Sequence, residues 1–145
     1  MVTGSPGEGA VVLAVDGGLR TRVPVVVSAA PDSRDLISRV SLSSTTLDAA
    51  TLTPALLTVR LGALGQGPAV IPVARFDANL VAANGQALGL LIRLRDALPG
   101  TYAFALTGTA PSGARLSPGS YSLRLVAYPT DGGAPTPRTV PITVK

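Results

Sequence analysis

Few side chains in this chain could act as a nucleophile, a general base or a metal ligand. The sequence contains no histidine and no cysteine, and its only lysine is the terminal residue Lys145. Histidine is the base of Ser-His-Asp catalysis, and Ser-Lys variants need a positioned lysine rather than a solvated chain end. The absence of cysteine also excludes disulfides and thiolate metal sites. We therefore expect no catalytic residues, no bound metal and no cofactor.

The acidic residues are scattered along the chain. A glycosidase needs two carboxyl groups at a set separation, and a calcium loop needs acidic residues at alternate positions; neither pattern occurs. Asp16, Asp32 and Asp131 stand beside glycine or proline, where aspartate usually binds the turn backbone. Asp35, Asp77 and Asp96 stand near arginines and are predicted to form ion pairs on the surface.

One glycine-rich run, Gly62-Ala63-Leu64-Gly65-Gln66-Gly67, has the composition of a loop that cradles phosphate. Such loops continue into a helix that carries lysine and serine or threonine, and no such helix follows here. We interpret the run as a flexible connection between two strands.

Four arginines form the one candidate binding site. Arg75, Arg93, Arg95 and Arg124 are predicted to form an exposed stripe that could recognise an acidic protein partner. The same arginines could equally serve solubility, since charged residues commonly keep sandwich faces from aggregating. The net charge is +4, but the arginines are dispersed and the chain has only three tyrosines and two phenylalanines to stack on bases. We therefore expect no binding to nucleic acid.

Short alternating segments must position these side chains. Apolar residues alternate with small or polar ones in segments bounded by Gly, Pro, Asn and Asp, whereas helical periodicity is hard to find. Two runs with the same pattern, Leu98-Pro99-Gly100-Thr101-Tyr102 and Leu116-Ser117-Pro118-Gly119-Ser120-Tyr121, combine a turn with a strand start, as at the corners of sandwich domains. No apolar run approaches the roughly 18 residues of a membrane-spanning helix.

The pattern predicts an all-β fold, an immunoglobulin-like antiparallel β-sandwich of about seven strands. The seven strands are predicted at 36–43, 56–61, 70–81, 86–95, 102–107, 121–128 and 139–144. The segment 47–57 is predicted to be an irregular crossover, with room for one helical turn before Pro54. Pro24 and Pro141 lie within predicted strands and place them at sheet edges, where a missing N–H is harmless.

Alternation also assigns the faces of these strands. Phe76, Ala78 and Leu80 are predicted to face the core, with Arg75, Asp77 and Asn79 on the opposite face. After a turn at Asn84-Gly85, the inward set is Leu88, Leu90, Ile92 and Leu94, with Arg93 and Arg95 opposite. The inward sets of the next two strands are Tyr102, Phe104 and Leu106, and Tyr121, Leu123 and Leu125.

An extra hairpin precedes the sandwich. The predicted strands 11–15 and 20–27 flank Asp16-Gly17-Gly18, a turn in which glycine accepts a positive φ. The loop 29–35 is the best candidate boundary. The chain is therefore divided into an N-terminal β-hairpin at 1–30 and a sandwich domain at 31–145.

A family resemblance extends over most of the chain. It rests on Arg22-Val23-Pro24, on Leu57-Thr58-Val59-Arg60-Leu61-Gly62, on the run from Arg93 to Tyr102, and on the final strand. With these residues the chain resembles the C-terminal accessory region of secreted, subtilisin-like serine peptidases of actinobacteria. The resemblance implies fibronectin-III-like and immunoglobulin-like modules, with residues 1–30 closing a preceding fibronectin-like module. The family's catalytic residues have no counterpart here.

These observations favour a non-catalytic accessory or interaction module of a secreted bacterial protein, located outside the cell or on the cell surface. The expected partner is another protein or an adjacent domain of the same polypeptide. The alternative is a bacteriophage capsid decoration or tail protein, for which the apolar content of 46% would be natural because assembly covers apolar faces. An obligate trimer or other ring would favour this alternative.

Overall fold

The computed structural model describes residues 7–14, 20–27, 35–64 and 70–145, and these residues form strands and turns without any helix. The strands are β1 (Gly7–Ala14), β2 (Arg20–Val27), β3 (Ile37–Leu42), β4 (Thr46–Leu47), β5 (Ala55–Leu61), β6 (Ala63–Leu64), β7 (Val70–Ile71), β8 (Val73–Ala82), β9 (Ala87–Ala97), β10 (Gly100–Leu106), β11 (Gly119–Pro129) and β12 (Thr136–Val144). The predicted all-β fold is confirmed.

Contacts divide the chain into two units, Met1–Ser33 and Arg34–Lys145. In the first unit β1 and β2 pair antiparallel, with Ala10 opposite Pro24. Both strands of a two-stranded sheet are edge strands, which is the position predicted for the strand that contains Pro24. The predicted turn at Asp16-Gly17-Gly18 and the aspartate Asp32 lie outside the described residues.

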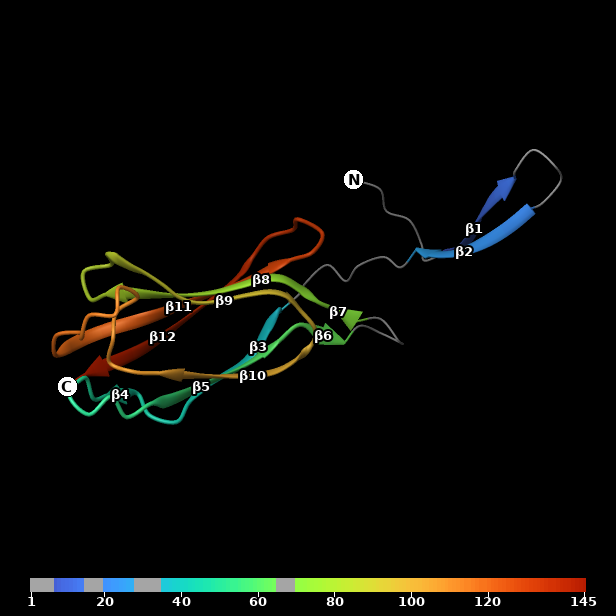
Figure 1. The fold of residues 1–145 in the computed structure, drawn as a ribbon. Coiled ribbons are helices and arrows are strands. Elements are labelled where there is room, and N and C mark those ends of the chain that lie inside the picture. The colour runs from blue at the N-terminus through green and yellow to red at the C-terminus, as the bar shows by residue number, and fades with distance from the viewer. Residues whose placement is uncertain (1–6, 15–19, 28–34, 65–69) are drawn as a thin grey trace. The chain divides into compact units, whose positions relative to one another are not determined.

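Two sheets pack face to face in the second unit (Figure 1). One has the strand order β10-β5-β3 and the other β4-β12-β11-β8-β9, and all neighbours are antiparallel except the short β4. Their inner faces supply one core, whose fully buried members include Leu57, Val59, Phe76, Leu123 and Leu125. The rings of Phe76 in β8 and Phe104 in β10 stack with centroids 6.2 Å apart. The antiparallel β-sandwich predicted from alternation is therefore present.

The hydroxyls of two tyrosines form hydrogen bonds across the corners that lead into β10 and β11. The hydroxyl of Tyr102 donates to the carbonyl of Leu98 at 2.8 Å, and that of Tyr121 donates to the carbonyl of Ser117 at 2.9 Å. Each bond spans four residues, so the repeated Pro-Gly-x-Tyr run builds the same corner twice. Both rings also pack against the core, as their inward assignment predicted.

Two details of the predicted strands are wrong. The strand predicted at 70–81 is interrupted at Pro72, so that β7 pairs with β6 and β8 begins at Val73. The β8–β9 register shifts twice, between Ala78 and Asn79 and again between Leu80 and Val81. At each shift β9 has one extra residue, Leu91 at the first and Leu88 at the second, and the two-residue alternation of its side chains is broken there. Leu91 therefore packs on the core, Leu90 lies opposite outward-facing Asn79, and Leu88 is exposed.

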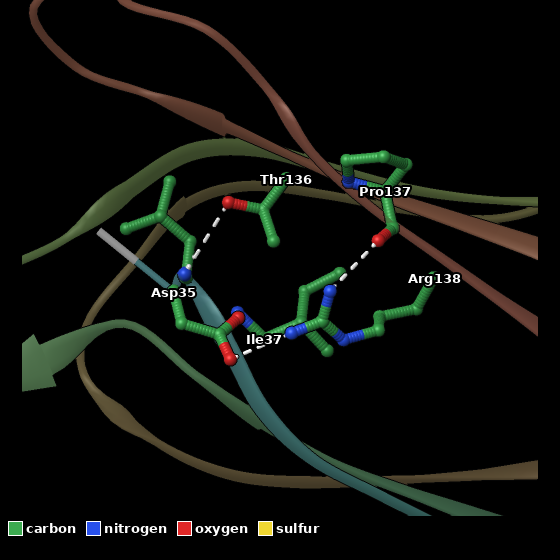
Figure 2. A network of polar contacts seen from close by, with 6 residues as sticks. Asp35, Ile37, Thr136, Pro137 and Arg138 are labelled. Carbon is green, nitrogen blue, oxygen red and sulfur yellow. Dashed lines mark hydrogen bonds and ion pairs between the residues drawn. The ribbon is translucent and has the colours of Figure 1, made fainter. Parts of the chain in front are cut away.

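A network of polar contacts fastens the beginning of β3 to β12 (Figure 2). Arg138 Nη2 donates to Asp35 Oδ2 at 2.6 Å, and the other carboxylate oxygen accepts the N–H of Ile37 at 3.2 Å. The predicted surface ion pair of Asp35 is thus present, with a partner far along the chain. Asp131 likewise has its predicted turn role, because it accepts the N–H of Gly133.

Gly62, which follows β5, combines a positive φ of 71° with a close approach of the chain. A Cβ here would lie 2.8 Å from the carbonyl oxygen of Ile71 and 2.9 Å from the Cα of Pro99. Gly62→Ala should therefore lower the free energy of unfolding by about 3 kcal/mol, from backbone strain and steric overlap together.

Gly85 provides the matched control for this prediction. Its φ is 84°, but a Cβ there would meet nothing within 4 Å. Gly85→Ala should cost only the backbone strain, about 1 kcal/mol. Chemical denaturation of both variants measures the difference. Equal losses would contradict the close contact at Gly62.

Candidate functional site

The candidate site lies on the outer face of the larger sheet. Phe76, Ala78 and Leu80 of β8 are buried in the core, so the alternate residues Arg75, Asp77 and Asn79 point away from it. The register places them in three rows across the sheet: Arg95, Arg75 and Tyr128; Arg93, Asp77 and Val126; and Leu90, Asn79 and Arg124. All four arginines of the predicted stripe therefore share one face, which we call the arginine face.

Asp77 is the centre of the arginine face. Arg93 donates to it through two bonds, Nε to Oδ1 at 2.7 Å and Nη2 to Oδ2 at 3.0 Å. The Asp77 side chain is only 7% exposed, so the prediction of an ion pair on the open surface is wrong in its location. Arg93 of β9 and the buried Val126 of β11 lie on either side of the carboxylate and cover it. The two hydrogen bonds that Arg93 donates to Asp77 raise the pKa of Arg93 above its usual value.

Arg75 is held between a carboxylate and an aromatic ring. Its guanidinium carbon lies 3.9 Å from the centroid of the Tyr128 ring, and its Nε lies 3.2 Å from Asp77 Oδ2. The second contact is an ion pair without hydrogen-bond geometry, because the buried Nε has no hydrogen-bond partner within the described residues. Arg75 is thus positioned by attraction from two sides.

Arg95 and Arg124 are exposed members of the arginine face that have no partner among the described residues. Neither forms an ion pair or hydrogen bond with any part of the chain that the structure describes. Arg95 lies directly opposite Arg75, and two like charges in such a pair repel each other. Four guanidinium groups therefore surround a single carboxylate, and this local excess of positive charge would favour an anionic group bound above the sheet.

Sequence reasoning placed the four arginines but missed Tyr128. The strand predicted at 121–128 only ends at this residue, although the alternation of Arg124, Val126 and Tyr128 indicates that all three share one face. The central position of Asp77 depends on which strands flank β8, and the alternation within a single strand does not reveal its neighbours.

The other sequence candidates are not brought together. The backbone of Lys145 is hydrogen-bonded on both sides, its N–H to the carbonyl of Leu47 and its carbonyl to the N–H of Ala49. Asp96 forms no ion pair within the described residues, contrary to prediction. Among those residues no group of three or more acidic side chains lies close enough to share a metal ion. Gly65, Gln66 and Gly67 of the glycine-rich run lie outside the described residues.

A small cavity of about 120 Å³ lies between the sheets, away from the arginine face. Its lining is Leu47, Leu80, Leu91, Ile92, Ala105, Leu106, Thr107, Thr109, Leu116, Leu123 and Ile142. Its only polar side chains are two threonines, whose hydroxyls bond each other at 2.7 Å. The lining thus offers no charged group to a ligand.

The described part of the chain has no helix long and apolar enough to span a membrane. A scan against protein-family models finds no match for this chain, and no curated protein matches it significantly.

Proposed function

We propose that this chain is a non-catalytic β-sandwich module that binds an acidic protein partner, or an acidic neighbouring domain of its own polypeptide, through the arginine face. The observation that carries the proposal is the pair of exposed, unpaired cations Arg95 and Arg124 beside the fixed cations Arg75 and Arg93. Guanidinium groups bind carboxylates through two parallel hydrogen bonds, so a partner with exposed aspartate or glutamate fits this face.

Composition supports the non-catalytic part of the proposal. Without histidine or cysteine, the chain lacks the side chains that most often exchange protons or attack substrates near neutral pH. Among the described residues, the ion pairs on the arginine face join Asp77 to Arg75 and to Arg93.

The context we propose is an accessory module of a secreted bacterial protein, of the kind that accompanies subtilisin-like peptidases. The resemblance of the segments around Arg22, Leu57 and Arg93 supports this context. Such a module would work outside the cell or on its surface and would hold its partner rather than act on it.

A protein partner is favoured over nucleic acid. Proteins that bind single strands combine basic grooves with exposed aromatic rings on which bases stack. The one aromatic ring on the arginine face, Tyr128, already has Arg75 stacked against it.

The proposal predicts that the double variant Arg95→Glu/Arg124→Glu loses binding to an acidic peptide. Titration calorimetry with an oligoglutamate peptide at low salt should show affinity reduced at least about tenfold, because two attractive contacts become repulsive. Both replaced side chains lie outside the Asp77 network, so the fold should persist.

The matched control is Arg39→Glu/Arg60→Glu. These two arginines are exposed and lie opposite each other on the outer face of the smaller sheet, so the control has the same net charge. It should bind the peptide within about twofold of the wild type. Equal loss in both variants, or equally tight binding of single-stranded DNA by the wild type, would contradict the proposal.

A further inference from the structure

One free edge of the sandwich, strand β10, is open to another strand. It ends the order β10-β5-β3 and pairs only with β5 among the described strands. The backbone N–H and C=O of Leu56 in β5 form hydrogen bonds with Ser43, on the side of β3. The backbone N–H and C=O groups of the alternate residues Leu57 and Val59 therefore point toward β10. Their partners Phe104 and Tyr102 are therefore bonded to β5. Thr101, Ala103 and Ala105 direct their N–H and C=O groups to the free side.

The other edges of the two sheets carry features that hinder strand addition. β3 is bulged between Ile37 and Arg39, and β9 carries two bulges and two arginines. β12 has Pro137 and Pro141, and β4 covers only its last two residues. By contrast, β10 pairs with β5 through seven consecutive residues without a bulge, and it contains no proline and no charge.

The β10 sequence matches a second copy of itself. In the run Thr101-Tyr102-Ala103-Phe104-Ala105, small and aromatic residues alternate symmetrically about Ala103. Antiparallel pairing with Ala103 on a two-fold axis places Tyr102 opposite Phe104 of the other copy. Thr101 then lies opposite Ala105. Aromatic residues meet aromatic residues on one face, and small residues meet small ones on the other.

The hydrogen-bonding pattern agrees with this register. Opposed residues exchange two N–H···O bonds when both direct their backbone groups toward the partner strand. In the proposed register, Ala103 forms such a pair with Ala103 of the other copy, and Thr101 forms one with Ala105 of the other copy. The outward side chains Thr101, Ala103 and Ala105 are exposed, whereas Tyr102 and Phe104 are half-buried. Pairing would cover the remaining exposed parts of both aromatic rings.

We propose that two copies of this chain associate through β10, joining the two three-stranded sheets into one continuous antiparallel sheet. A second copy is the occupant we propose because β10 itself carries no charge. Charged residues on this edge would add to the repulsion between two chains that each have a net charge of +4. This dimer is independent of the arginine face, which lies on the other sheet.

Analytical ultracentrifugation of the whole chain between about 1 µM and 1 mM tests the proposal. The wild type should pass from one to two copies per particle over this range. Ala103→Lys should remain monomeric at every concentration, because it places two like charges directly opposite each other. The control Ser41→Lys adds the same charge in the same row of the same face, two strands from β10, and should dimerise as the wild type does.

A second measurement does not depend on any variant. The amide protons of Thr101, Ala103 and Ala105 should exchange at least about tenfold more slowly at high protein concentration than at low concentration. A wild type that stays monomeric throughout would overturn the proposal, as would unchanged dimerisation of Ala103→Lys. Formation of trimers or larger rings would also overturn it.

Discussion

Replacing Phe76 by alanine should lower the free energy of unfolding by about 4 kcal/mol. The side chain is completely buried in β8, and its ring stacks on Phe104 of the opposite sheet. Removal leaves a cavity at the junction of the two sheets, where both backbones are held by their own ladders and cannot collapse into the space. Chemical denaturation followed by circular dichroism measures the loss.

Phe76→Leu is the control for this variant. It keeps most of the volume and loses only the aromatic pairing, so it should cost about 1.5 kcal/mol. A loss below about 1 kcal/mol for the alanine variant would show that Phe76 does not lie between the sheets.

Replacing Tyr121 by alanine should lower the free energy of unfolding by roughly 3 kcal/mol or more. The change removes the packing of the ring against the core and the hydrogen bond to the Ser117 carbonyl at the entrance to β11. This strand pairs with both β8 and β12 and is central in the larger sheet. Loosening its corner therefore affects ladders on both sides.

Tyr121→Phe separates the two contributions. It removes the hydroxyl alone and should cost about 1 kcal/mol, the usual net value of one hydrogen bond. Tyr102→Phe should cost a similar amount, because its hydroxyl makes the equivalent bond to Leu98. A loss below about 1 kcal/mol for Tyr121→Ala would mean that this corner does not hold β11 in place.

The strands and their faces could be predicted wherever a regular two-residue period ran without interruption. Tyr102, Phe104 and Leu106 in β10, and Tyr121, Leu123 and Leu125 in β11, face inward as alternation requires. In β9 the same reasoning failed for Leu88 and Leu90, since the two bulges depend on how β8 and β9 fit together over the core. A bulge leaves little trace in the residue pattern of a single strand.

The candidate site could be predicted as a set of residues but not as a network. Alternation within each separate strand predicts that the four arginines point away from the core. That Asp77 lies between Arg93 and Val126 is a property of strand order, which puts β8 between β9 and β11. Its burial follows from the same order, as neighbouring side chains on both strands shield it from water.

The central functional claim is that the exposed arginines of the larger sheet bind acidic groups. Nuclear magnetic resonance of the arginine Nε–H groups during titration with an oligoglutamate peptide tests it most directly. We expect the signals of Arg95 and Arg124 to move with increasing peptide while those of Arg39 and Arg60 stay in place. Equal movement of all four signals, or none, would contradict the claim.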